Sequence, residues 1–178
     1  VKDIDLIAFY EDPILKWDRI YKTNLTYSRI LNLGKLFNWF SSKLHVEDEI
    51  YKNLKDYKGK ILISQHHVSH AASAFYPSPF NESTIVVLDG IGEWACTSIG
   101  RGINNRIELL AEQRFPHSLG FLYSAFTQYL GFKVDSGEYK VMGLAPYGKA
   151  IYSEIIKEKL ISIKENGILE INTDYFDF

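Results

Sequence analysis

Three histidines within five residues, His66, His67 and His70, are the strongest chemical signal in this sequence. They follow the apolar run at residues 61–63 and lead into the stretch 71–75, where a buried strand is expected to give way to a helix. In a helix that has begun by His66, the side chains of His66 and His70 lie on one face. Two imidazoles on one face can bind one metal ion, so we expect a metal site that still requires a carboxylate or water.

His67 is the less certain member of this group. It occupies the position at which helical zinc proteases carry their glutamate base, so that mechanism fits poorly. Active sites of α/β folds gather at strand-to-helix junctions, which favours a catalytic or supporting role for His67. The structural alternative is that His67 and Ser69 merely cap the helix.

A second candidate is the loop Asp89-Gly90-Ile91-Gly92, which ends the apolar strand predicted over residues 84–88. Backbone N–H groups in such a loop can bind phosphate, while the carboxylate of Asp89 can hold a divalent ion, its water or a polar substrate group. Glycine lets the backbone approach a ligand closely. An ordinary hairpin turn is the alternative.

The glycine-rich stretch 136–148 contains Glu138 and Lys140 and is followed by Lys149. These charged side chains are candidates to close over an anion, and tight helix packing is the alternative. The sequence contains neither a Walker loop nor a dinucleotide-binding fingerprint.

The sequence predicts strands and helices that would position these candidate site residues. A strand over residues 4–9 precedes three helices, and a meander of three strands follows the histidines. The helices form a layer over one face of a sheet, with partner binding as the alternative. Ser118 is a predicted N-cap, and Gly131 a predicted helix end. The predicted helices span residues 12–22, 30–44, 50–57, 66–75, 119–129 and 152–160, and the later strands 84–88, 94–100, 107–113 and 167–171.

Composition narrows the function classes. The 178 residues have a hydrophobic fraction of 46% and a net charge of −2, which predicts a folded core and no basic surface for nucleic acid. No apolar run is long enough to span a bilayer, so we expect no membrane partner. A single cysteine, Cys96, suits a reducing compartment, and we predict a cytoplasmic protein.

Four sequence blocks together resemble the O-carbamoyltransferases of the NodU/CmcH type. The His-His-Val-Ser-His block opens residues 66–80, and the Asp-Gly-Ile-Gly-Glu-Trp block follows at 89–94. The other two are Phe-Pro-His-Ser-Leu-Gly at 115–120 and the glycine-rich block at 137–148. The opening at residues 9–13 also resembles the family, so the resemblance covers nearly the whole chain.

The resemblance implies an α/β fold, part of an actin-like, ribonuclease-H-related ATPase domain with a mixed sheet, a strand meander covered by helices and a helical insertion near residues 12–58. It implies transfer of a carbamoyl group from carbamoyl phosphate, through an ATP-derived carbamoyladenylate, to a hydroxyl of a small acceptor such as a sugar, an antibiotic or a nodulation factor. A separate carbamoyladenylate-forming domain is the expected partner in the full chain.

The same resemblance assigns His66 and His70 as ligands of a divalent metal, iron or zinc. Asp89, Gly90 and Gly92 match a phosphate loop, and Glu138 and Lys140 lie in a signature block for nucleotide or carbamoyl binding. Asp89 is expected to position the carbamoyl group, the nucleotide or the acceptor hydroxyl.

The match also predicts that residues 1–178 form one partial domain. A third metal ligand is expected from an aspartate that lies beyond Phe178 in the full protein, and the second domain is also expected to lie outside these residues. With two ligands and one phosphate loop, the isolated chain is expected to bind metal weakly, to bind nucleotide poorly and to be inactive.

Two other functions stay open. One is a transferase acting on tRNA, like the threonylcarbamoyl enzymes, against which the balanced charge argues. The other is a non-catalytic module that binds a partner through its helical region and keeps a vestigial site.

Overall fold

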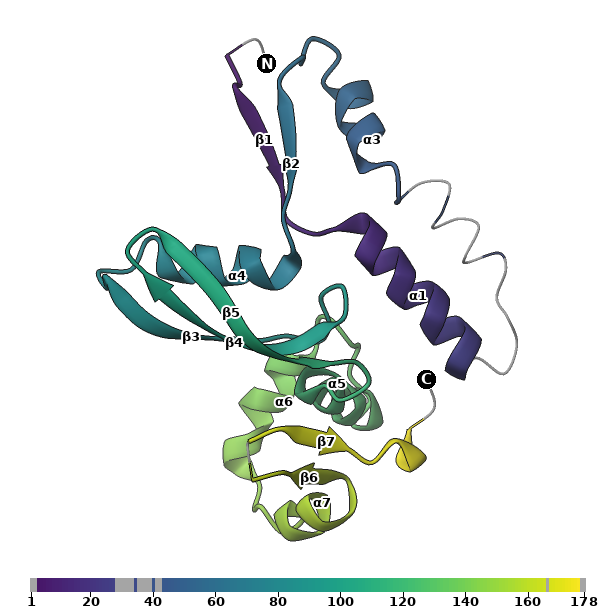
Figure 1. Cartoon of the computed structure of the whole chain (residues 1–178). Coiled ribbons are helices and arrows are strands. Elements are labelled where there is room, and N and C mark those ends of the chain that lie inside the picture. Colours follow the sequence, from purple (N-terminus) through teal and green to yellow (C-terminus); the bar gives the residue numbers. More distant parts are fainter. Residues whose placement is uncertain (1–2, 28–33, 35–39, 41–42, 166, 177–178) are drawn as a thin grey trace.

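The computed structural model describes residues 3–27, 34, 40, 43–165 and 167–176. It is an α/β structure in which the described strands form three separate sheets (Figure 1). The first is a parallel pair, β1 (Leu6–Phe9) and β2 (Lys60–Ile63), and the second is the antiparallel meander β3 (Glu82–Leu88), β4 (Ala95–Ile103) and β5 (Arg106–Arg114). A third, β6 (Ile161–Ile163) with β7 (Leu169–Ile171), is also antiparallel. The α/β class is confirmed, but the expectation of one mixed sheet is wrong for the described strands.

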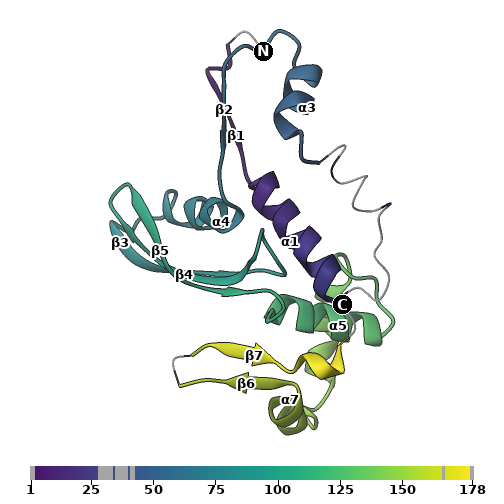
Figure 2. The ribbon, with the colours of Figure 1, turned by 45° about the vertical axis from the view of Figure 1, so that its right-hand side comes forward.

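The histidine helix is the element that covers the meander. Helix α4 (His66–Phe75) lies across one face of β3, β4 and β5 in both views (Figures 1 and 2). Ala71 and Phe75 pack there against Ile85 and Val87. The alternate residues of β3 face the other way, so Val86 and Leu88 are exposed. An apolar strand therefore buries only one of its faces here.

Helices α1 (Pro13–Tyr27) and α3 (Val46–Asn53) lie in the predicted helical region. Asp12 caps α1 as expected, because its Oδ1 accepts the N–H groups of Ile14 and Leu15. Helix α1 continues beyond the predicted end at residue 22, whereas α3 ends at Asn53, well before Gly59. Most of the helix predicted over 30–44 lies outside the described residues.

The C-terminal part follows the sequence pattern except for the strand β6 (Ile161–Ile163), which was not predicted. Ser118 caps α5 (Leu119–Tyr129), and Gly131 follows it with a φ of 84°, the left-handed conformation that glycine favours. The glycine-rich stretch forms α6 (Glu138–Leu144) and a 3-10 turn, Ala145–Tyr147. Helix α7 (Ser153–Lys159) and the hairpin β6–β7 complete the structure, with a short 3-10 turn at Thr173–Tyr175. A small core of Leu122, Leu169 and Ile171 joins this hairpin to α5.

Candidate metal centre

Helix α4 brings its two outer histidines together at its first turn. The helix begins at His66, as the sequence predicts, so His66 and His70 share one face. Their Nε2 atoms lie 3.0 Å apart, and the two rings meet edge to face at 4.6 Å between centroids. Both rings thus present a nitrogen at one point, the arrangement that a shared metal ion requires.

The carboxylate of Asp89 lies at the same point. Asp89 follows directly on β3, and its Oδ2 is 2.9 Å from Nε2 of His66 and 3.9 Å from Nε2 of His70. One ligand atom from each of the three residues lies within 4.8 Å of the other two. The third ligand was expected from an aspartate beyond Phe178, whereas the structure brings Asp89 to the histidine pair.

These three side chains fit a divalent transition metal. Nitrogen ligands about 2.0–2.1 Å from a tetrahedral zinc lie about 3.3 Å apart, which is within the range of the separations here. Among the described residues, the buried Oδ2 of Asp89 has no hydrogen-bond partner, and neither does the buried Nδ1 of His66. An imidazole nitrogen and a carboxylate oxygen that approach to 2.9 Å without forming a hydrogen bond are expected where a cation would lie between them. Two histidines and one carboxylate suit zinc or ferrous iron.

His67 lies behind this group rather than in it. Its side chain is buried, its Nδ1 lies 2.7 Å from Oγ of Ser98, and its Nε2 lies 3.9 Å from Oδ2 of Asp89. Burial lowers the pKa of His67, so the ring is neutral near pH 7. The interpretation of His67 as a helix cap is wrong, because its ring contacts β4. The hydroxyl of Ser69 donates to the carbonyl oxygens of Tyr10 and Gln65, so it does not cap the helix N–H groups either.

The Asp89 loop is a closed turn. Oδ1 of Asp89 accepts the N–H of Gly90, and the N–H of Gly92 donates to the carbonyl of Ala95 at 2.9 Å. Both glycine N–H groups are therefore already paired, and the loop as described offers neither to a phosphate. A Cβ at Gly92 would make a tight contact, 3.1 Å from Cδ2 of His67 and 3.2 Å from Cβ of His66.

Two residues at the start of α5, outside the predicted site, pack against this loop. The fully buried Ser118 donates from its Oγ to the carbonyl oxygen of Gly90 at 2.6 Å while accepting the N–H of Phe121. A Cβ on Gly120 would lie 2.7 Å from the backbone of Gly90. Sequence reasoning assigned Ser118 only as a helix cap, although its place in the 115–120 block was a signal for a role near the site.

Glu93 is a further residue that sequence reasoning left without a role. It is a buried carboxylate four positions after Asp89, and it accepts the N–H of His66 at 2.9 Å. Its position directly after the Asp-Gly-x-Gly turn was the sequence feature that could have indicated a role near the site. A buried carboxylate needs hydrogen-bond donors, and the residues next to Glu93 in the sequence include no lysine or arginine to supply them.

Glu138 and Lys140 lie on α6, which packs against α5. The Glu138 carboxylate is engaged locally, accepting from Oγ of Ser124 at 2.9 Å and from the N–H groups of Asp135 and Gly137. These hydrogen bonds, with the backbone N–H of Glu138 first, lower its pKa. The Lys140 ammonium lies 6.0 Å from the ring centre of Tyr139. The structure does not bring either residue into the histidine and aspartate group.

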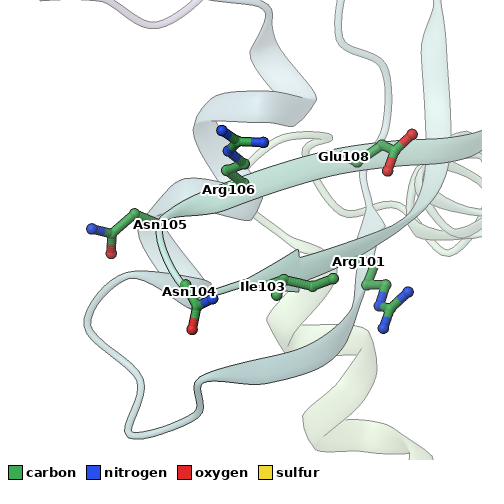
Figure 3. Close-up of a pocket in the computed structure, with 6 residues that line it drawn as sticks. All are labelled: Arg101, Ile103, Asn104, Asn105, Arg106 and Glu108. Atoms are coloured by element: carbon green, nitrogen blue, oxygen red, sulfur yellow. The ribbon is translucent and has the colours of Figure 1, made fainter.

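A hollow of about 580 Å³ lies at the tip of the β4–β5 hairpin (Figure 3). Arg101 and Arg106 point away from each other there, and Arg101 is paired with Glu82. The side chains therefore do not converge on a common ligand. The geometry favours the histidine cluster as the site of chemistry.

Comparison with known proteins agrees with the sequence resemblance. Residues 3–178 match the family described as carbamoyltransferase N-terminus. The chain belongs to this family. The predicted membership among the NodU-type transferases is thereby confirmed, and with it a general link to carbamoyl transfer.

Individual relatives match parts of longer proteins. An uncharacterized protein of Synechocystis sp. is 44% identical over all of this chain, which corresponds to 31% of that protein. Nodulation protein NolNO of Sinorhizobium fredii is 38% identical over 65% of this chain and 17% of its own length. Nodulation protein NolO of Bradyrhizobium diazoefficiens is 41% identical over 47% of this chain and 15% of its own length. The chain thus spans less than a third of each of these relatives.

Within the part of the chain that the structure describes, no helix has both the length and the apolar character needed to cross a bilayer.

Proposed function

We propose that this chain carries the metal-binding wall of a carbamoyl-transfer site, in a protein that carbamoylates a hydroxyl of a small molecule. The observation that carries the proposal is the convergence of His66, His70 and Asp89 within 4.8 Å. Membership in the carbamoyltransferase family supplies the reaction class. The three side chains supply the place where the metal would be held.

The reaction we propose uses a carbamoyladenylate, formed from carbamoyl phosphate and ATP by another part of the protein. The acceptor oxygen attacks the carbamoyl carbon and forms a new C–O bond. The bond from that carbon to the adenylate phosphate oxygen breaks, AMP leaves with the electron pair, and the acceptor proton passes to a base or to water. Negative charge develops on the carbonyl oxygen during this step.

The proposed metal would supply a Lewis acid at neutral pH. His66, His70 and Asp89 would hold it. His67, whose Nδ1 is anchored to Oγ of Ser98, lies beside them with its Nε2 3.9 Å from Oδ2 of Asp89. The paired N–H groups of Gly90 and Gly92 leave nucleotide phosphate binding to donors elsewhere.

We also propose that the fold is part of an actin-like, ribonuclease-H-related domain. Two features of the chain are consistent with such a domain. The antiparallel meander β3–β5 is followed by helix α5, and the parallel strands β1 and β2 are connected through helices. Cleft enzymes built on open sheets place their ligands at strand ends, and Asp89 lies at the end of β3.

The two alternatives are less well supported. A net charge of −2 does not favour tRNA, because nucleic-acid binding proteins carry basic surfaces. The vestigial alternative does not explain why Oδ2 of Asp89 approaches Nε2 of His66 to 2.9 Å without a hydrogen bond.

The test is the variant H70A in the intact protein, with H45A as the matched control because His45 is an exposed histidine on a different segment. Carbamoyl phosphate, ATP and a panel of sugars and other hydroxyl compounds are supplied, and carbamoylated product is followed by mass spectrometry. We expect H70A to abolish metal-dependent transfer and H45A to retain the wild-type rate. Full activity in H70A would refute the assignment.

A further inference from the structure

Glu93 joins two helix starts to the loop that carries Asp89. Its carboxylate is buried, with 6% of the residue exposed. One oxygen, Oε1, accepts both the N–H of Asp12 at 2.7 Å and the N–H of His66 at 2.9 Å. A single side chain therefore connects three segments that are far apart in sequence.

The two donors are N–H groups that need a partner. His66 is the first residue of α4, and Gln65 before it makes no side-chain cap. The first N–H groups of a helix have no acceptor within the helix, so an outside acceptor must satisfy them. A carboxylate suits this position because the helix dipole favours negative charge there. Glu93 thus acts as the cap that the local sequence of α4 lacks.

The loop between Asp89 and Glu93 is held at both ends. At one end, the N–H of Asp89 donates to the carbonyl of Cys96 at 2.9 Å, and at the other Glu93 accepts from His66. Between them Gly92 lies next to α4, where an added Cβ would be 3.1 Å from Cδ2 of His67 and 3.2 Å from Cβ of His66. The hydrogen bond to Cys96 closes the loop on itself, and the loop cannot slide along α4 without losing the hydrogen bond from the His66 N–H to Glu93.

We propose that Glu93 is a positioning residue, which locks the Asp89 loop to the first turn of α4 and thereby sets the spacing of the metal ligands. This inference rests on the proposed function, because it assigns a purpose to the 2.9 Å approach of Asp89 Oδ2 to His66 Nε2. Glu93 contacts the backbone of His66 and no ligand atom. It acts through the ligands and not on the substrate.

The test compares E93A and E93Q in the intact protein, with E108A as the control for removal of an exposed carboxylate from the same meander. Gln retains an amide oxygen that can accept both N–H groups, whereas Ala removes the acceptor. We measure zinc and ferrous iron affinity by chelator competition, and kcat and KM for the acceptor. Hydrogen exchange of the peptide containing the His66 amide reports the contact itself.

We expect E93A to weaken metal binding about tenfold or more, the range found for groups that orient metal ligands. It should lower kcat while leaving KM for the acceptor nearly unchanged, and E93Q should restore most of the metal affinity. Thermal unfolding of each variant separates a local effect from loss of the fold. Wild-type metal affinity in a folded E93A, or E93Q as defective as E93A, would overturn the inference.

The outcome for Glu93 is separable from that for the proposed function. If the wild-type protein binds no metal, the proposed function fails, and the exchange of the His66 amide still decides whether Glu93 holds the helix start. Faster exchange in E93A than in E93Q and E108A supports the contact. Equal exchange in all three variants contradicts it.

Discussion

Nε2 of His66 lies 2.9 Å from Oδ2 of Asp89, although one residue begins α4 and the other directly follows β3. Because α4 packs on the face of β3, the first turn of the helix and the end of the strand meet at one edge of the meander. The packing of Ala71 and Phe75 on Ile85 and Val87 fixes this relationship. The core of this region therefore also determines the geometry of the candidate metal centre.

Removal of the Ser98 hydroxyl should destabilise the protein. In S98A the buried Nδ1 of His67 loses the partner 2.7 Å away, and an unpaired buried polar group costs about 1–3 kcal/mol. The free energy of unfolding of the intact protein, measured with denaturant, checks this. The exposed Ser162 on β6 provides the control S162A, which should be neutral. An S98A protein as stable as S162A would count against the His67–Ser98 contact.

Ser118 should matter for both the fold and the loop. Its Oγ caps α5 and also holds the carbonyl of Gly90, so S118A should lose about 1–2 kcal/mol from the missing cap. Because the Asp89 loop loses an anchor as well, metal affinity should fall with stability. Denaturation together with a zinc titration checks both effects. Unchanged zinc affinity in S118A would show that the loop is held without Ser118.

Two glycine substitutions should have opposite effects. In G120A the new Cβ would lie 2.7 Å from the backbone of Gly90, so the loop must move, at about 1–3 kcal/mol. Gly143 lies inside α6 with nothing within 4 Å of a Cβ, so G143A should be neutral or stabilise by up to about 1 kcal/mol. Thermal unfolding distinguishes them. If G120A proved as stable as G143A, the close approach of α5 to the Asp89 loop would be wrong.

Cys96 should be unreactive in the folded protein. It is fully buried, and burial raises the pKa of its thiol to about 11. Since the thiolate is the nucleophile, only about one molecule in a thousand would carry it at pH 8. Alkylation at pH 8, followed by mass spectrometry of the Cys96 peptide, should show modification only after denaturant is added. Rapid labelling of the native protein would contradict this burial.

The sequence predicted the elements around the site well because local signals define them. The Asp12 and Ser118 caps, the positive φ of Gly131 and the three strands of the meander all follow from residue types at short spacing. The start of α4 at His66 was predicted too, and with it the histidine pair. Local patterns were less informative about helix ends, so α1 continues to Tyr27 and α3 ends at Asn53.

Relationships between distant segments could not be read from the sequence. The meeting of Asp89 with the histidines depends on how α4 packs on β3, and the role of Glu93 depends on the approach of α1 and α4 to one loop. The Asp-Gly-x-Gly pattern predicted a phosphate loop, but local hydrogen bonds to Asp89 and Ala95 pair the N–H groups of Gly90 and Gly92 within the turn. The residue pattern alone does not show whether the N–H groups of such a loop are free to bind a phosphate or are paired within the turn.

The metal content of the intact protein tests the central claim most directly. The wild-type protein, D89N and H45A are loaded with zinc or ferrous iron, dialysed, and assayed for bound metal by elemental analysis. We predict that wild type and H45A retain one metal ion at this site, and that D89N loses it because Asn cannot supply the anionic ligand at Oδ2. A wild-type protein that retains no metal, or a D89N protein that retains as much as wild type, would contradict the account.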